Sequence, residues 1–341
     1  MHPTLISPLL RRARRAWIAF AGLAAGVGGT LGAQVPVVVT TGGGTAVQRA
    51  DALLRDGHRT AATDLLGQHL AEQPTDGRAW LYLGRIYLAD AQRWHREGHQ
   101  GEPPGPLLLD FAGAAFEQSQ QLMTDSGTVH RVLVAVEKAT NRTEESGWDA
   151  AVALGLPAEE VPLPPVLSEL GHNLTASCPR GGVLITGSLV ETAAAWGIRL
   201  LEGNPGDLIL LRPDLYAWDA RYRAAMSQAL DVDSSATLAT ALLRASVNRP
   251  ICLAPSVDSL LAPSLDWRPL HMVLITGPAR SREAGTLSVH QLARTGLAGS
   301  VWSEAVVDAY DLAARRNPAL CRSLFVATDA QGLPTISSCP R

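Results

Sequence analysis

The segment Ala46–Tyr87, AVQRADALLRDGHRTAATDLLGQHLAEQPTDGRAWLYLGRIY, decides the fold of the N-terminal half of the chain. Its apolar residues recur with helical spacing, and Gly57 and Pro74 stand where such helices would turn and end. Asp76 has the side chain of an N-cap, directly before the helix that carries Trp80. The segment therefore predicts an antiparallel helical hairpin followed by the first helix of a second hairpin.

A repeat spacing connects these helices. Trp80, Leu83, Gly84 and Tyr87 stand in the order W-x2-L-G-x2-Y, and Ala46 lies one 34-residue period before Trp80. This pattern resembles the tetratricopeptide repeat (TPR), whose stacked helix pairs form extended binding surfaces. The alternative is an ordinary helical hairpin in an unrelated all-α domain.

The repeat is interrupted beyond Tyr87. Gly98–Pro106 (GHQGEPPGP) cannot continue a helix, and A-x3-F, the second half of the motif, appears only at Ala112–Phe116. The sequence thus predicts an insertion at the turn between paired helices, where loops often contact partners. Further helices are predicted at Thr128–Thr140 and Trp148–Leu154. We expect partner-binding residues on the interrupted repeat: Arg85, Trp94, His95, His99 and Glu102.

The N-terminal segment, residues 1–41, is typical of an export signal. Four arginines between Arg11 and Arg15 precede an uncharged run from Ala16 to Thr41. The basic residues would stay on the cytoplasmic side while the far end of the run is translocated. Either the segment is cleaved near Leu31–Ala33, or residues 16–39 remain as a membrane anchor. The protein is thus expected in the periplasm, soluble or anchored.

Composition narrows the partner classes. The net charge is −3 over 341 residues, and no basic stripe follows the leader, so nucleic acid is a poor candidate. The cysteines form no C-x2-C pair, which in an exported chain favours disulfides over a zinc site. We expect at least one disulfide, and Cys321 with Cys339 closes the shortest loop. The four cysteines are Cys178, Cys252, Cys321 and Cys339.

The spacing of apolar residues changes in the C-terminal half of the chain. The stretch 156–179 contains five prolines and predicts an extended linker between a helical domain at 42–155 and an α/β domain at 180–341. Short apolar runs alternate with helical stretches there, which is typical of a mainly parallel sheet. The predicted strands are Val183–Thr186, Leu208–Leu211, Ile251–Ala254 and Met272–Thr276. The predicted helices are Glu191–Leu201, Trp218–Leu230, Ala236–Val247 and Ser303–Arg316. A closing hairpin is predicted from Leu324–Thr328 and Thr335–Ser338, and the whole chain is of the α + α/β class.

One pentapeptide, Val-Leu-Ile-Thr-Gly, ends two of these strands, at 183–187 and 273–277. If both turns share one edge of the sheet, that edge is where open α/β sheets bind ligands. Ser188, Glu191 and Thr276 mark this possible ligand edge. The more conservative interpretation makes Ser188 a helix cap and Glu191 its capping-box partner.

Val183–Glu202 (VLITGSLVETAAAWGIRLLE), Asp207–Tyr216 (DLILLRPDLY) and the stretch around Arg249–Ala254 carry a second similarity. They resemble the soluble tail of bacterial multi-spanning membrane proteins related to protein O-mannosyltransferases. The acidic and amide residues that follow the first strand in that family are replaced here by Ser188–Val190, and the multi-spanning catalytic part is absent. The resemblance implies an α/β fold and association with the envelope, without transferase activity.

Signatures of catalysis are few. His95 and His99 have the spacing of a metal pair without a third ligand in reach by sequence, so we expect solvated surface residues. Asp231 and Asp233 suggest a turn and a helix cap. We expect no catalytic residue, metal or cofactor. Four large aromatic residues are expected in the core: Trp196, Trp218, Tyr222 and Trp302.

Two functional hypotheses follow. The favoured one is a non-catalytic exported scaffold that binds proteins, such as an extrinsic subunit or assembly factor of a multi-subunit inner-membrane complex, respiratory, photosynthetic or secretory. The alternative is a glycan-processing or glycan-binding envelope protein with a site in the α/β domain, near Gly187, Glu191 and Gly277.

Overall fold

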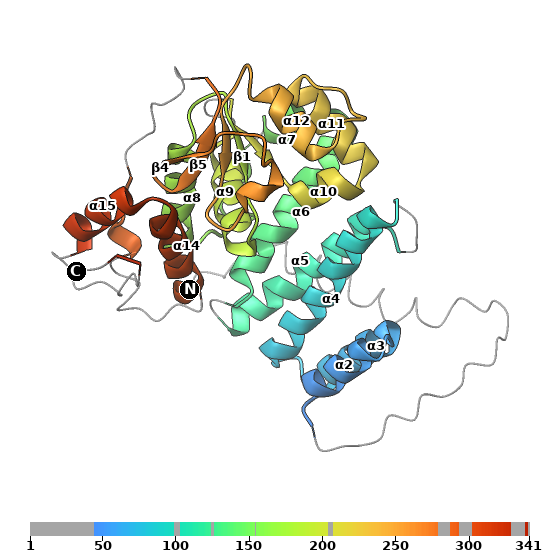
Figure 1. Cartoon of the computed structure of the whole chain (residues 1–341). Coiled ribbons are helices and arrows are strands. Elements are labelled where there is room, and N and C mark those ends of the chain that lie inside the picture. The colour runs from blue at the N-terminus through green and yellow to red at the C-terminus, as the bar shows by residue number, and fades with distance from the viewer. Residues whose placement is uncertain are drawn as a thin grey trace, which may run out of the picture. The chain divides into compact units, whose positions relative to one another are not determined.

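The computed structural model describes residues 44–98, 103–123, 126–153, 155–203, 207–278, 287–292, 302–328 and 338–339. Residues 44–341 form one compact unit, separate from residues 1–43. The predicted leader, His99 and Glu102 lie outside the described residues. Within the described part, no helix has both the length and the apolar character needed to cross a membrane. The fold combines helices with a small sheet, as the α + α/β prediction requires (Figure 1).

The described residues begin with the helices α2 (Ala46–Arg55), α3 (Arg59–Glu72), α4 (Gly77–Arg96) and α5 (Gly105–Leu122). The predicted caps are in place, because the Asp76 carboxylate accepts hydrogen bonds from the backbone N–H groups of Arg78 and Ala79. Gly57 adopts a φ of 81° in the turn after α2, a conformation that glycine tolerates best. The helical hairpin expected from the sequence is therefore present.

The two halves of the interrupted motif meet in space. A Cβ atom on Gly84 would lie 2.6 Å from the ring of Phe116, so only glycine lets α4 and α5 approach this closely. Phe116 is fully buried, and Trp80 is 6% exposed with its Nε1–H donating to the Pro74 carbonyl at 2.9 Å. The segments that carry the two halves of the motif thus belong to one pair of packed helices, α4 and α5.

A helix occupies part of the stretch predicted as an extended linker. Three helices follow α5: α6 (Thr128–Ser146), α7 (Trp148–Val152) and α8 (Pro165–Ser177). The linker prediction is wrong for α8 because Pro164 and Pro165 occupy the N-cap and first position, where a missing N–H disrupts nothing. Leu167, Leu170 and Leu174, spaced as one helix face, are fully buried.

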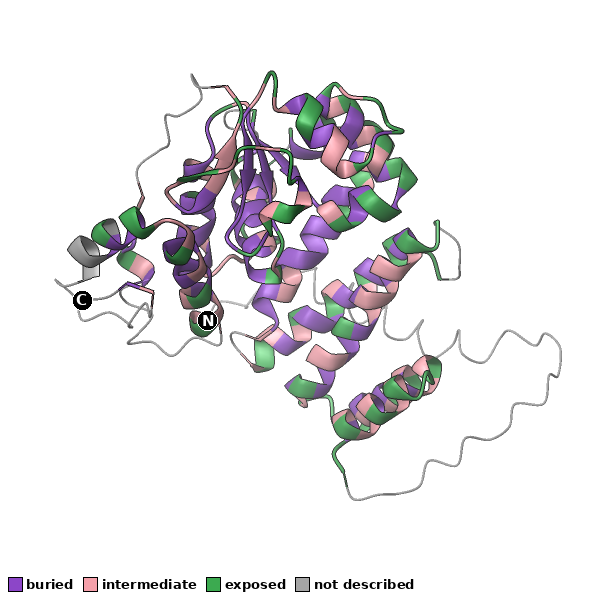
Figure 2. Cartoon of the chain, in the orientation of Figure 1, coloured by how far each residue is buried: buried purple, intermediate pink, exposed green. Residues whose placement is uncertain are grey.

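Among the described residues, five strands form a sheet in the order β2-β1-β3-β5-β4. Its strands are β1 (Val183–Ile185), β2 (Ile209–Leu211), β3 (Ile251–Leu253), β4 (Arg268–Leu270) and β5 (Val273–Thr276). The first three pair in parallel, whereas β5 is antiparallel to both β3 and β4. Every residue of β1, β2 and β3 is buried (Figure 2), as expected for strands covered on both faces.

Helices surround this sheet: α9 (Leu189–Glu202), α10 (Pro213–Trp218), α11 (Ala220–Leu230), α12 (Leu238–Ala245), α14 (Ser303–Arg316) and α15 (Pro318–Thr328). The predicted helix Trp218–Leu230 starts later, because Asp219 caps α11. The predicted closing hairpin is wrong at its first strand, since Leu324–Thr328 belongs to α15. Its second strand falls largely outside the described residues.

Two disulfides bond all four cysteines. Cys178 joins Cys252, and Cys321 joins Cys339, which confirms the prediction of at least one disulfide. Cystines persist in oxidising compartments, so the pair indicates an exported chain. One hydrophobic core includes Phe116 of α5, Leu167 of α8 and Leu184 of β1, and thus continues from the helical part into the sheet.

Candidate functional site

The carboxyl ends of β1 and β3 form the place where an open α/β sheet would bind a ligand, because the chain connections diverge between these strands. The Glu191 side chain fills it and is 0% exposed. Its Oε2 atom accepts from the N–H groups of Gly187 and Ser188, both at 3.3 Å, and from the Ser256 hydroxyl. Its Oε1 atom accepts from the Ser256 N–H at 2.8 Å.

The Ser188 hydroxyl in turn accepts from the Glu191 N–H at 3.2 Å, which completes a capping box at the start of α9. The capping interpretation of Ser188 and Glu191 is confirmed. These polar groups bond one another at the strand ends.

Thr276 lies at the other end of the strands. It pairs with Ile251, the first residue of β3, whereas Gly187 follows the last residue of β1. The prediction that the two Thr-Gly turns share one edge is wrong because β5 runs antiparallel to β3. Ser188 and Glu191 therefore do not form a site with Thr276.

The predicted partner-binding residues of α4 separate into three environments. Arg85 is exposed, as a contact residue should be. Trp94 is half-buried, because Gly105 lies so close that a Cβ there would be 2.5 Å from its ring. His95 is only 1% exposed, so the expectation of a solvated histidine is wrong. The reason is that its face of α4 turns toward α6 and the start of α11.

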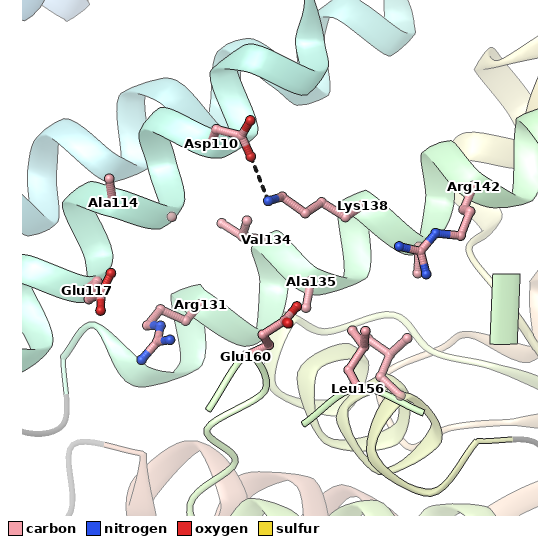
Figure 3. A pocket seen from close by; sticks show the side chains of 13 residues that line it. Asp110, Ala114, Glu117, Arg131, Val134, Ala135, Lys138, Arg142, Leu156 and Glu160 are labelled. Atoms are coloured by element: carbon pink, nitrogen blue, oxygen red, sulfur yellow. Dashed lines mark hydrogen bonds and ion pairs between the residues drawn. The ribbon is translucent and has the colours of Figure 1, made fainter. Parts of the chain in front are cut away.

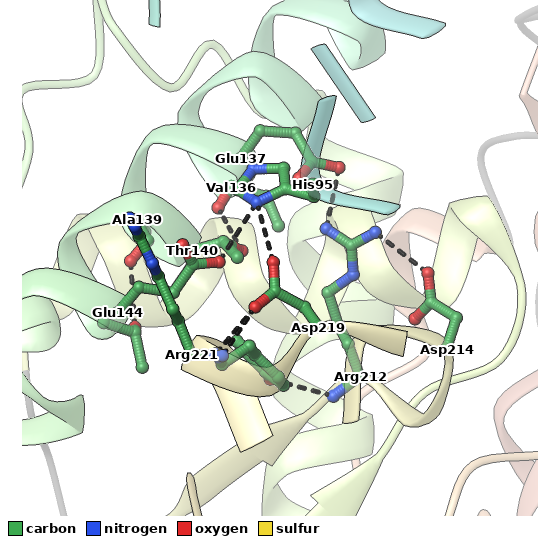
Figure 4. Close-up of polar contacts among 12 residues, drawn as sticks. His95, Val136, Glu137, Ala139, Thr140, Glu144, Arg212, Asp214, Asp219 and Arg221 are labelled. Carbon is green, nitrogen blue, oxygen red and sulfur yellow. Dashed lines mark hydrogen bonds and ion pairs between the residues drawn. The ribbon is translucent and has the colours of Figure 1, made fainter. Parts of the chain in front are cut away.

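His95 lies instead in a buried cluster with two carboxylates (Figure 4). Its Nδ1 atom is 3.1 Å from Glu144 Oε1 and 3.3 Å from Asp219 Oδ2. The other carboxylate oxygen of Asp219 accepts from the N–H groups of Arg221 and Tyr222 at 2.8 and 3.0 Å, which orients the carboxylate. Burial alone would lower the pKa of His95, but the adjacent carboxylates of Asp219 and Glu144 raise it to about 9.

A buried ion pair lies beside this cluster. Arg212 donates from Nη1 to Glu137 Oε1 at 2.7 Å, and Gln92 donates to the same oxygen at 2.8 Å. Burial opposes the charge of Arg212, yet the carboxylates of Glu137 and Asp214 raise its pKa above the usual range. No local pattern predicts the contact between His95 and Asp219, because the two residues are separated by 124 positions.

Two other sequence interpretations are settled by local contacts. Asp231 takes a left-handed conformation at the end of α11, and Asp233 accepts from the Ser235 N–H at 2.8 Å, so this pair is a turn and a cap, as predicted. Among the aromatic residues expected in the core, Trp196 and Tyr222 are fully buried. Trp218 is 57% exposed, with the Arg96 guanidinium 5.8 Å from its ring centre, and is a surface residue.

A groove of about 330 Å³ lies between α5 and α6 (Figure 3). Small residues line it, among them Gly113, Ala114 and Ala135. Lys138 and Asp110 form an ion pair across it at 2.7 Å and are 48% and 63% exposed. The lining also contains further charged residues, Glu117, Arg131, Arg142 and Glu160, and apolar residues, Val134, Leu156 and Leu200.

Comparisons with protein-family models, curated proteins and solved structures find no match to this chain. The two resemblances drawn from the sequence therefore stay predictions.

Proposed function

We propose that this protein is a non-catalytic exported scaffold whose helical part binds a segment of a partner protein. The groove between α5 and α6 is the observation that carries the proposal. Its small residues leave room for a partner backbone or side chain, and its exposed charges of both signs can pair with a mixed-charge segment. The groove is open to solvent, whereas sites for small molecules are mostly enclosed.

The surroundings of the groove support the same function. It is formed by α5, which carries Phe116 and the second half of the interrupted repeat motif, and by the next helix along the chain. Stacked helix pairs bind partners through extended surfaces of this kind. The glycan-directed alternative gains no support from the geometry, because Glu191 is buried in a capping box and Thr276 lies at the opposite edge.

The compartment is the second part of the proposal. The arginine cluster before an uncharged run favours export, and the two disulfides fit an oxidising environment such as the periplasm. A partner in or on the inner membrane, such as a subunit of a multi-subunit complex, fits a chain delivered there.

The test is quantitative affinity purification from solubilised membranes with the native leader intact. Ala114→Arg places a long side chain in the groove from an exposed position on α5, and Ala150→Arg makes the same change on the exposed face of α7, away from the groove. We expect Ala114→Arg to reduce the partner at least tenfold and Ala150→Arg to retain it. Equal recovery with both variants would refute a partner site in this groove.

A further inference from the structure

Three helices bring three metal-binding side chains to one buried point. His95 comes from α4, Glu144 from α6, and Asp219 from the position that caps α11. One ligand atom from each lies within 4.8 Å of the other two. The side chains are 1%, 4% and 2% exposed, so the cluster is closed to solvent.

The distances suit coordination of a single ion. Zinc binds nitrogen and carboxylate oxygen at about 2.0 to 2.2 Å, which puts neighbouring ligand atoms roughly 3 to 3.6 Å apart. The two distances from His95 Nδ1, 3.1 and 3.3 Å, fall in this range. A single ring nitrogen carries at most one proton, and one proton cannot make a linear hydrogen bond to two carboxylates at once.

Two buried acceptor atoms lie on the same helix as Glu144. Glu137, Asn141 and Glu144 follow one another at helical spacing on one face of α6. Within the described residues, Glu137 Oε2 and Asn141 Oδ1 are buried and accept no hydrogen bond, and the Glu137 side chain is only 3% exposed. Arg212 engages the other oxygen of Glu137. Both atoms are acceptors on the face of α6 that carries Glu144, and a buried acceptor without a hydrogen bond can be satisfied by a cation.

We propose that His95, Glu144 and Asp219 bind one divalent transition-metal ion. The imidazole ligand favours zinc or manganese over magnesium and calcium, which prefer oxygen ligands alone. The Arg221 and Tyr222 N–H groups hold Asp219 from behind, as outer partners of metal ligands commonly do.

The burial of the ligands makes this a structural site. No ligand is exposed enough to leave a coordination position open to solvent and substrate, which a catalytic zinc requires. The ion would join α4 to α6 and to the start of α11, which packs against α6 and α7. The proposed metal site shares no residue with the α5–α6 groove, so either proposal can fail without affecting the other.

The experiment uses the full chain without an affinity tag, stripped of metal by a chelator and titrated with Zn²⁺ or Mn²⁺ in a calorimeter. We expect one ion per chain. Glu144→Gln and Asp219→Asn keep side-chain size, and asparagine still caps a helix. Each should weaken binding at least tenfold. His172→Gln is the matched control, because His172 forms an exposed pair with Glu202 at 2.8 Å.

The wild-type chain supplies a readout that needs no variant. Crystals grown with the bound ion should show its anomalous signal among His95, Glu144 and Asp219. The proposal is overturned if neither ion binds at one per chain, if the ion lies elsewhere, or if His172→Gln weakens binding as much as a folded Glu144→Gln or Asp219→Asn does.

Discussion

Replacing Glu191 with glutamine should destabilise the fold by about 2 to 4 kcal/mol. The carboxylate accepts from Gly187, Ser188 and both donors of Ser256, while glutamine has one acceptor oxygen. If the amide oxygen takes the place of Oε2, the amide NH2 group faces the Ser256 N–H. One buried donor then lacks a partner, which costs about 1 to 3 kcal/mol, and the remaining bonds lose their charge assistance.

The assay is urea unfolding with the disulfides intact, comparing Glu191→Gln with the wild type and with Glu145→Gln, an exposed glutamate on α6. Glu145→Gln should stay within about 0.5 kcal/mol, as surface changes usually do. A Glu191→Gln chain as stable as this control would refute the capping account of the carboxylate. It would then favour a role for Glu191 that binding or activity assays could detect.

Two further predictions concern the helical part. Trp80→Ala should cost about 3 to 5 kcal/mol, because it removes a ring that is 6% exposed; an unchanged melting temperature would contradict the packing of α4. The pH dependence of stability should contain a contribution from His130, whose pKa burial lowers to about 4 from 6.5. As the pH drops, His130 is protonated in the unfolded chain before it is protonated in the folded chain. The free energy of unfolding should therefore fall by roughly 1 to 3 kcal/mol between pH 6.5 and 4. When stability is measured by urea denaturation at a series of pH values, His130→Phe should reduce the loss between pH 6.5 and 4. A pH dependence unchanged by the substitution would count against a half-buried neutral imidazole.

Local signals predicted local structure well. The Asp76 cap, the Ser188–Glu191 capping box and the helix Ser303–Arg316 all depend on residues within a few positions of one another. The high number of prolines in residues 156–179 led to the wrong prediction of an extended linker. The position of a proline relative to the helix start matters more than the number of prolines. Pro165 begins α8 instead of preventing it.

These local sequence patterns could not predict contacts between segments that are distant in the chain. An apolar strand has the same pattern in either direction, so nothing in Val273–Thr276 predicted that β5 would reverse and carry Thr276 away from Glu191. His95 appeared to be a surface residue because its carboxylate partners come from helices much later in the chain. The candidate site was therefore predictable only where its residues are neighbours in sequence.

The disulfide between Cys178 and Cys252 restricts the order of events during maturation. Cys252 lies in β3, between β1 and β5, and is 0% exposed, while Cys178 at the end of α8 is 5% exposed. An oxidising enzyme must reach a thiol to act on it, and neither sulfur is accessible once the sheet has closed. The oxidant therefore has to meet the chain before β3 is enclosed, which couples delivery into the oxidising compartment to an unfinished fold. Chain that folded completely in a reducing cytosol would carry two enclosed thiols, which later transport alone would not join.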